Sequence, residues 1–160
     1  MANRRSPQDS KEALIGRLML AMRRSSAAGV LHGQAIAKRV GVNSSDLECL
    51  DLILLNGPAT AGDIARRTGL TSGAVTGLID RLERQGLVER MADDHDRRKV
   101  LVRVREDGIA PIGALFAPME KSMQGLLAAY SREELKTLLD FAERAGEFML
   151  ARIAELNDGK

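Results

Sequence analysis

The chain has 160 residues and a net charge of +2, with 44% hydrophobic and 29% charged residues, a balance typical of a folded globular protein that excludes a disordered one. Aromatic residues make up only 2%, so the core must be built from aliphatic side chains, which favours helices. The single cysteine, Cys49, excludes an internal disulfide framework and is typical of a cytoplasmic protein. No stretch approaches the roughly 18 apolar residues that cross a membrane, and residues 1–10 lack the apolar core of a secretory signal.

The charge is unevenly distributed. Residues 1–24 carry six Lys and Arg against two Asp and Glu, and residues 60–105 carry ten against seven. Residues 106–160 are acidic, with six against ten. A basic middle segment is expected of a protein that contacts a polyanion, but an ordinary solvated surface would look the same.

Residues 11–23 predict an amphipathic helix. Its apolar side chains recur at helical spacing; they are Leu14, Ile15, Leu18, Met19 and Met22. Gly29 and Gly33 indicate a break. A short helix is then expected over residues 34–40, ending at Gly41.

The next helix is predicted from Ser45 to Leu55. Ser45 and Glu48 have the spacing of a capping box. The segment Asn56-Gly57-Pro58 then ends the helix and turns the chain.

Residues 60–86 have the spacing of a helix-turn-helix. Two helices are predicted, over residues 60–67 and 71–85, capped by Thr60 with Asp63 and by Thr71. The second of these helices is closed by Gly86.

The turn between these two helices has the residues typical of a helix-turn-helix. Ala65 is the small residue that steeply crossing helices need where they touch, and Gly69 tolerates a left-handed turn. Branched apolar residues follow beneath the second helix: Val75, Leu78, Ile79 and Leu82. The spacing indicates DNA binding, and the alternative is an ordinary helical hairpin in a helical core.

The outer face of the second helix is unusual for its glycines. An exposed glycine inside a helix costs about 1 kcal/mol relative to Ala. Gly73 and Gly77 therefore indicate that something approaches the backbone closely, either the floor of a major groove or another subunit. Thr71 and Ser72 lie beside free N–H groups that can bind a phosphate. The predicted contacts of this recognition helix are Thr71, Ser72, Gly73, Ala74, Thr76, Gly77, Arg81 and Arg84.

Residues 87–91 and 99–105 predict a β-hairpin, because they are rich in Val at alternating positions. A hairpin that follows a recognition helix can reach the adjacent minor groove, which is narrow and strongly negative. The predicted contacts of this wing are His95, Asp96, Arg97, Arg98 and Lys99.

The wing loop is not simply basic, because three aspartates offset its three cations. The aspartates are Asp93, Asp94 and Asp96. We expect Asp96 to orient Arg98 through a salt bridge. The alternative is a solvated loop that neutralises itself.

Two long helices are predicted after Asp107-Gly108, within residues 109–156. Ser131 with Glu134 caps the second of them. The terminal helices carry more apolar surface than a small winged domain can cover, and one recognition helix makes too few base contacts for useful specificity. Both points predict a dimer whose two copies bind about one helical turn apart.

The stretch from Ser45 to Gly108 resembles the MarR family of winged-helix regulators. The residues that carry the resemblance are Leu55-Asn56-Gly57-Pro58, Asp63-Ile64-Ala65, Gly69-Leu70, Thr76 through Leu82, Gly86-Leu87-Val88, Asp96-Arg97-Arg98, Val100, Val102 and Asp107-Gly108. The family often has Pro where Asp94 stands here, so the loop shape is expected to differ, while the minor-groove role carries over to Arg98.

The resemblance implies a mainly α fold with a small β-wing, formed as one domain over residues 1–160. Residues 45–106 would form the winged helix-turn-helix, and residues 11–40 and 109–156 the dimerisation helices. It implies a cytoplasmic, nucleoid-associated homodimer that binds a palindromic operator in double-stranded DNA, and a repressor that a small-molecule effector or, in some members, oxidation releases.

Met19, Met22 and Cys49 are the candidates for an effector pocket. The methionines would equally suit a dimer interface, since methionine is adaptable. Cys49 lies in an apolar helical pattern, so a buried structural role competes with a redox-sensing one.

No catalytic or metal-binding pattern is present. His32 and His95 are the only histidines, and with one cysteine they form no zinc-type cluster. We therefore expect no enzyme, cofactor or metal. Two alternatives remain, a protein-interaction module and an RNA-binding winged domain, although residues 60–105 contain no aromatic residue to stack on single-stranded bases.

Overall fold

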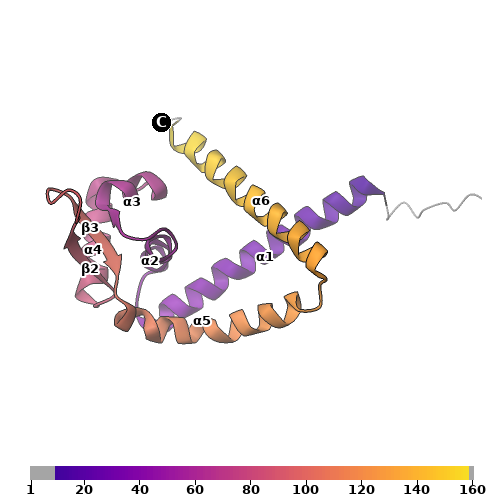
Figure 1. The fold of residues 1–160 in the computed structure, drawn as a ribbon, viewed down its shortest axis with the longest axis horizontal. Helices are drawn as coiled ribbons and strands as arrows, with labels where there is room; N and C mark the ends of the chain where they lie inside the picture. Colours follow the sequence, from indigo (N-terminus) through magenta and orange to yellow (C-terminus); the bar gives the residue numbers. More distant parts are fainter. Residues whose placement is uncertain (1–9, 159–160) are drawn as a thin grey trace, which may run out of the picture.

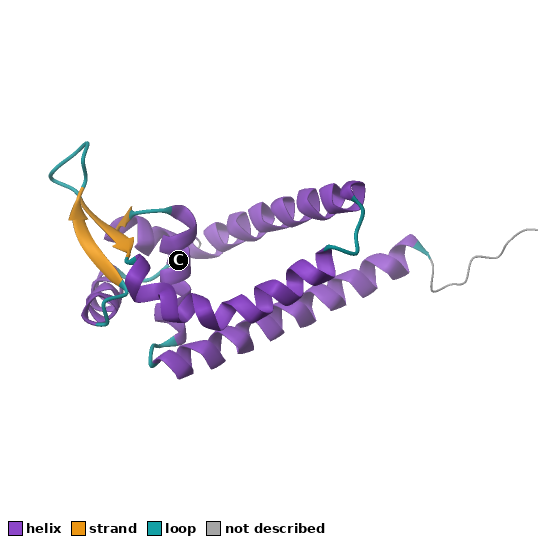
Figure 2. Ribbon diagram, turned by 60° about the horizontal axis from the view of Figure 1, so that its bottom comes forward, coloured by secondary structure: helices purple, strands orange, loops and turns teal. Residues whose placement is uncertain are grey.

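The computed structural model describes residues 10–158, and the prediction about a leader within residues 1–10 lies almost wholly outside them. The described part is mainly helical with one small antiparallel sheet, as expected (Figures 1 and 2). The elements in chain order are α1 (Lys11–Val40), α2 (Ser44–Asn56), β1 (Ala59–Thr60), α3 (Ala61–Thr68), α4 (Ser72–Arg84), β2 (Val88–Ala92), β3 (Val100–Val104), α5 (Glu106–Leu127) and α6 (Arg132–Asp158). Within residues 10–158, no helix has the length and apolar character that crossing a membrane requires.

The predicted break near Gly29 and Gly33 is wrong, because α1 is one helix of 30 residues. A glycine weakens a helix but ends it only when its backbone turns left-handed, and neither of these two residues has a positive φ. The helix ends at Gly41, which does, with φ of 75°.

The capping box predicted at Ser45 and Glu48 is also wrong. The N-cap of α2 is Asn43, whose side chain makes no capping hydrogen bond, and Ser45 lies inside the first turn. The predicted end is confirmed, because Gly57 follows Asn56 with φ of 78°.

The caps of the helix-turn-helix are confirmed. The Thr60 hydroxyl accepts a hydrogen bond from the backbone N–H of Asp63 at 3.1 Å, and Asp63 Oδ2 accepts one from the backbone N–H of Thr60 at 3.1 Å. Gly69 makes the turn with φ of 70°. These local bonds fix where α3 begins and where it gives way to α4.

The sheet has the strand order β1-β3-β2, and all its pairs are antiparallel. β2 and β3 form the predicted hairpin, with Val88 opposite Val104 and Ala92 opposite Val100. The two-residue β1 was not predicted, because so short a strand leaves no periodicity to detect. It pairs Ala59 with Val102 and so fastens the start of α3 to the wing.

The core lies within the winged part, between α2, α3, α4 and the sheet, and includes the end of α1 and the start of α5. Its most deeply buried members are aliphatic, as the composition predicts; they include Ile53, Val75, Leu78, Ile79, Leu82, Val88 and Val102.

The long helices α1 and α5 extend away from this core, and α6 runs back from the far end of α5 (Figure 1). The helix after the wing begins at Glu106, three residues before the predicted start, and therefore contains Gly108. The capping box at Ser131 is confirmed, since its backbone N–H and hydroxyl each lie 2.8 Å from Oε2 of Glu134. Large apolar side chains remain exposed along these helices, among them Leu18, Met19, Leu31, Met123, Leu126, Leu139, Phe148, Met149 and Leu150.

Candidate nucleic-acid interface

Helix α4 turns one face into the core and the other outward. Its apolar side chains Val75, Leu78 and Leu82 are almost completely buried. Thr71 forms the N-cap, and its hydroxyl accepts a hydrogen bond from the backbone N–H of Ala74 at 3.3 Å. The helix therefore presents its N-terminal N–H groups and positive dipole end at the surface, where an anion would be stabilised.

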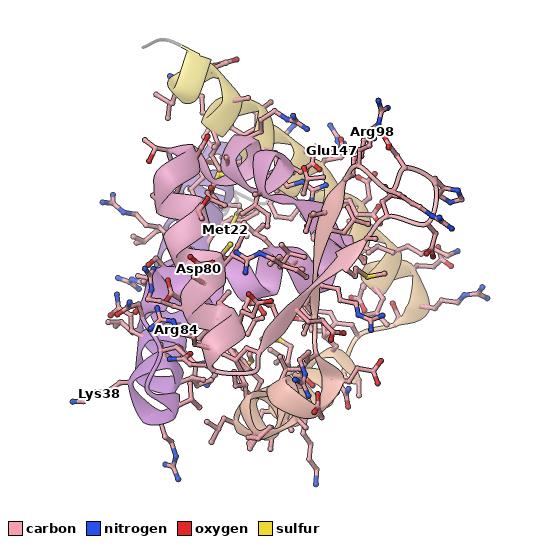
Figure 3. All side chains as sticks on the ribbon, turned by 90° about the vertical axis from the view of Figure 1, so that its left-hand side faces the viewer. Met22, Lys38, Asp80, Arg84, Arg98 and Glu147 are labelled. Carbon is pink, nitrogen blue, oxygen red and sulfur yellow. The ribbon has the colours of Figure 1, made fainter. Side chains whose placement is uncertain are left out.

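The predicted contacts of α4 lie together on or beside its outer face. Thr71, Ser72, Gly73, Ala74, Thr76 and Arg84 are exposed, and Gly77 and Arg81 are half-buried. Figure 3 shows Arg84 on the exposed side of α4, together with Asp80.

The outer face is open at its first glycine. A Cβ built at Gly73 would have no atom within 4 Å, and one at Gly77 would meet only Nη1 of Arg81, at 3.7 Å. Packing within one chain therefore does not require glycine at either position.

Arg81 is bound to a buried carboxylate. Its Nε and Nη2 lie 2.8 and 2.7 Å from the two oxygens of Asp46, whose side chain is only 2% exposed. Asp46 lies in the first turn of α2, so this pair joins α2 to the last turn of α4. The hydrogen bonds that Arg81 donates to Asp46 raise the pKa of its guanidinium, and two of its five N–H donors are already used.

A second ion-pair network joins α4 to the wing. The Arg90 guanidinium on β2 contacts the carboxylates of Asp80, at 2.5 Å, and of Glu83. Both carboxylates raise the pKa of Arg90. The network fixes the strand against the helix, and so the distance between the two predicted contact elements.

The five predicted wing residues lie together in the loop between β2 and β3 or at its edge. Asp93 shapes the loop, because its Oδ1 accepts a hydrogen bond from the backbone N–H of His95 at 2.8 Å. Asp96 Oδ1 accepts from Nε of Arg98 at 3.1 Å and from its backbone N–H at 3.2 Å, so the predicted pair is present. These hydrogen bonds from Arg98 lower the pKa of Asp96. The Arg98 side chain is 92% exposed and extends from the wing tip (Figure 3).

Further cations lie near this surface that the sequence did not single out. Arg66 and Arg67 are exposed on α3, the helix that crosses the DNA backbone in helix-turn-helix proteins. Arg66 pairs with Asp63. Lys38, in the last turn of α1, extends from the side of the molecule that also carries Arg84 (Figure 3). Its place could not be predicted because it depends on how α1 packs against α2 and α5.

The three residues predicted for an effector pocket lie in two different environments. Met19 and Met22 are exposed on the N-terminal half of α1, whereas Cys49 is 1% exposed in the core. Burial, and secondarily the charge of Asp46, raises the pKa of the Cys49 thiol to about 11. A cavity of about 340 Å³ lies elsewhere, between α1, α2 and α5, and its lining includes Gly33, Asp51 and Phe116.

Within residues 10–158, no three His, Cys, Asp or Glu side chains are grouped as metal ligands would be. His32 instead packs edge-on against Phe116, with ring centroids 5.5 Å apart. The two rings join α1 to α5.

Comparison with known proteins agrees with this geometry. The model of the MarR family matches residues 28–99. The HTH-type transcriptional regulator YcgE of Bacillus subtilis is 34% identical over 151 residues, which cover 94% of this chain and 98% of that protein. The homoprotocatechuate degradative operon repressor of Escherichia coli is 22% identical over 126 residues, covering 79% of this chain and 85% of the repressor.

Solved structures show the same fold. A MarR family protein from Bacillus stearothermophilus superposes with a TM-score of 0.65 at 24% identity, over 88% of this chain and 98% of that one. Apo MarR from Escherichia coli superposes with a TM-score of 0.53 at 21% identity, over 81% and 95%. The relatives are named as transcriptional regulators, not as enzymes.

Proposed function

This chain belongs to the MarR family, and its relatives are transcriptional regulators of the helix-turn-helix type, so it is a DNA-binding transcriptional regulator. We propose that it is a cytoplasmic homodimeric repressor of a palindromic operator, released by a small-molecule effector. The observation that carries the proposal is that the outer face of α4 and the side chain of Arg98 are both exposed. Both lie on the surface of the winged part, and the Arg90 network holds the strand next to the helix.

In the proposed complex, α4 enters the major groove with its N-terminal half against the base edges. The exposed Arg98 at the wing tip enters the adjacent minor groove, whose negative potential favours an extended cation. The exposed cations on α3 and Lys38 would contact phosphates, which position the protein but carry no sequence information.

The proposed partner in the dimer is a second copy of the chain. The apolar side chains on α1, α5 and α6 are too numerous and too exposed for a monomer: Met19 is 66% exposed, Leu139 58% and Phe148 71%. An exposed apolar surface of this extent is characteristic of a protein interface. A two-fold dimer would also place two copies of α4 on two half-sites, as a palindrome requires.

The proposed effector site is the 340 Å³ cavity between α1, α2 and α5, rather than the surroundings of Cys49. It lies where the winged part meets the long helices, so an occupant can change the angle between the two recognition helices of a dimer. The repressor role follows the names of relatives such as the YetL repressor of Bacillus subtilis, which is 30% identical over 90 residues.

The proposal is tested by selecting duplexes from a random library on the full-length protein. An inverted repeat with half-sites about one helical turn apart is the expected product. Competition with single-stranded DNA and with RNA of the same sequence should leave the complex intact. Enrichment of single strands or RNA would contradict the proposal, as would the absence of any selected sequence.

A further inference from the structure

The outer face of α4 offers few hydrogen-bonding groups to a base. Its N-terminal two turns expose Ser72, Gly73, Ala74 and Thr76, and none of these carries an amide or guanidinium that could bind a base in a bidentate way. Of the two arginines in the last turn of the helix, Arg81 already binds both oxygens of Asp46.

The hydroxyl groups of the two threonines in this part of the helix already make hydrogen bonds within the chain. The Thr76 hydroxyl lies 2.9 Å from the backbone carbonyl of Ser72 and donates to it. The Thr71 hydroxyl accepts a hydrogen bond from the N–H of Ala74. With its hydroxyl directed back to the helix, Thr76 has a methyl group left to offer a partner, and Ala74 has only a methyl group.

The glycines determine how near these methyl groups can come. Gly73 has no side chain, and a Cβ built there would meet no atom within 4 Å, so the helix surface beside Ala74 is low and open to the outside. A recessed helix surface allows the helix to lie deep in the groove, and methyl groups on its face then reach the base edges.

We propose that α4 reads thymine 5-methyl groups through the methyl groups of Ala74 and Thr76, rather than reading bases through side-chain hydrogen bonds in its N-terminal half. In the major groove, thymine is distinguished by this methyl group, and Ala and Thr contact it by apolar packing. The inference rests on the proposed function, and it predicts at least one thymine in each half-site opposite the N-terminal half of α4.

The experiment replaces thymine by deoxyuridine, one position at a time, in a duplex selected by the full-length protein. This removes the 5-methyl group and leaves base pairing unchanged. We expect one or two positions in each half-site to weaken binding about fourfold, the factor for exposing one methyl group to water.

The variant Thr76→Ser sharpens the test, because it removes the methyl group and keeps the hydroxyl that bonds Ser72. It should bind thymine and deoxyuridine equally at one position where the original protein distinguishes them. Thr137→Ser is the matched control: Thr137 makes the same hydroxyl-to-carbonyl bond, at 3.1 Å to Glu133, on α6. This control should retain the full discrimination.

Two results would overturn the inference, and they differ in what they say of the proposed function. Specific binding that is indifferent to deoxyuridine at every position would refute methyl readout alone. A selection that returns no preferred sequence would refute the proposed function and the methyl readout with it.

Discussion

The carboxylate of Asp46 on α2 binds the guanidinium of Arg81 on α4 through two hydrogen bonds, of 2.8 and 2.7 Å. The two residues are 35 positions apart in the sequence. Since Asp46 is buried and Arg81 is half-buried, the pair fixes the rotation of the recognition helix relative to the core.

Loss of either partner should destabilise the protein, but unequally. Arg81→Leu leaves a buried carboxylate without a partner, whereas in Asp46→Asn the arginine can turn toward solvent and the amide can still accept a bond. Urea unfolding should show a loss of about 1–2 kcal/mol for Asp46→Asn and a larger loss for Arg81→Leu. The double variant Asp46→Leu/Arg81→Leu should be more stable than Arg81→Leu alone. Equal losses from both single variants would contradict the pair's geometry.

The role of the ion pair between Asp96 and Arg98 in the wing can be distinguished from a simple charge effect on DNA binding. Asp96→Asn removes a negative charge near DNA, which by charge alone should strengthen binding. If Asp96 orients Arg98, as their 3.1 Å bond indicates, the same variant should weaken binding about threefold to tenfold. Asp94→Asn removes a charge from the same loop and is the matched control, with affinity unchanged or slightly raised. In a titration of DNA with each variant, Arg98→Ala should lower the affinity more than Asp96→Asn does. An Asp96→Asn protein that binds more tightly than the original would exclude the orienting role.

Gly108 should tolerate no side chain. A Cβ there would lie 2.1 Å from the carbonyl oxygen of Gly86 and 3.2 Å from Cα of Leu87, and both of these are backbone atoms. Gly108→Ala is therefore expected to lower the free energy of unfolding by about 1–3 kcal/mol. Gly62→Ala, whose nearest atom would be the Thr60 hydroxyl oxygen at 3.7 Å, should be neutral or slightly stabilising. Thermal unfolding of the two variants side by side checks the difference, and a harmless Gly108→Ala would refute the close approach.

Cys49 is expected to be inert in the folded protein. Burial, with the charge of Asp46 in second place, raises the pKa of its thiol from 9.0 to about 11. The unfolded chain therefore loses this proton first, so stability should fall as the pH rises from about 9 and level off above about 11. At about pH 8, iodoacetamide should label Cys49 only as fast as the chain unfolds. Rapid labelling of the native protein would favour a redox-sensing role instead.

Local sequence signals predict the start of a helix wherever the expected capping hydrogen bonds form. Thr60 with Asp63, Thr71, and Ser131 with Glu134 all begin helices as predicted, because each cap needs only residues three positions apart. Gly57 and Gly69 were placed correctly for the same reason.

The errors include one local cap, because Asn43 and not Ser45 is the N-cap of α2, and two features of the long helices. Helix α1 continues through Gly29 and Gly33, although a local count of helix breakers favoured a break. The helix after the wing is predicted to begin only after Gly108, yet Gly108 is helical and is glycine because the backbone of Gly86 lies against it.

Among the site residues, those on α4 and the wing could be predicted from spacing, and the structure places them on neighbouring surfaces. The salt bridge between Arg81 and Asp46 could not be predicted, because the charge pattern does not show which cation faces a buried carboxylate. The positions of the extra cations on α3 and α1 could not be predicted because they depend on how these helices pack in the folded chain.

The most direct test of the central claim is a fluorescence anisotropy titration of a selected duplex, at about 150 mM salt, with a scrambled duplex as control. We expect a preference of about 1,000-fold or more for the selected duplex, with two protomers bound per duplex. Leu139→Glu, which places a charge on the exposed apolar face of α6, should abolish this preference and halve the mass in solution to the 17.4 kDa of one chain. Lys136→Glu, also exposed on α6, should change neither. Equal, salt-sensitive binding of both duplexes by a 17.4 kDa monomer would contradict the account.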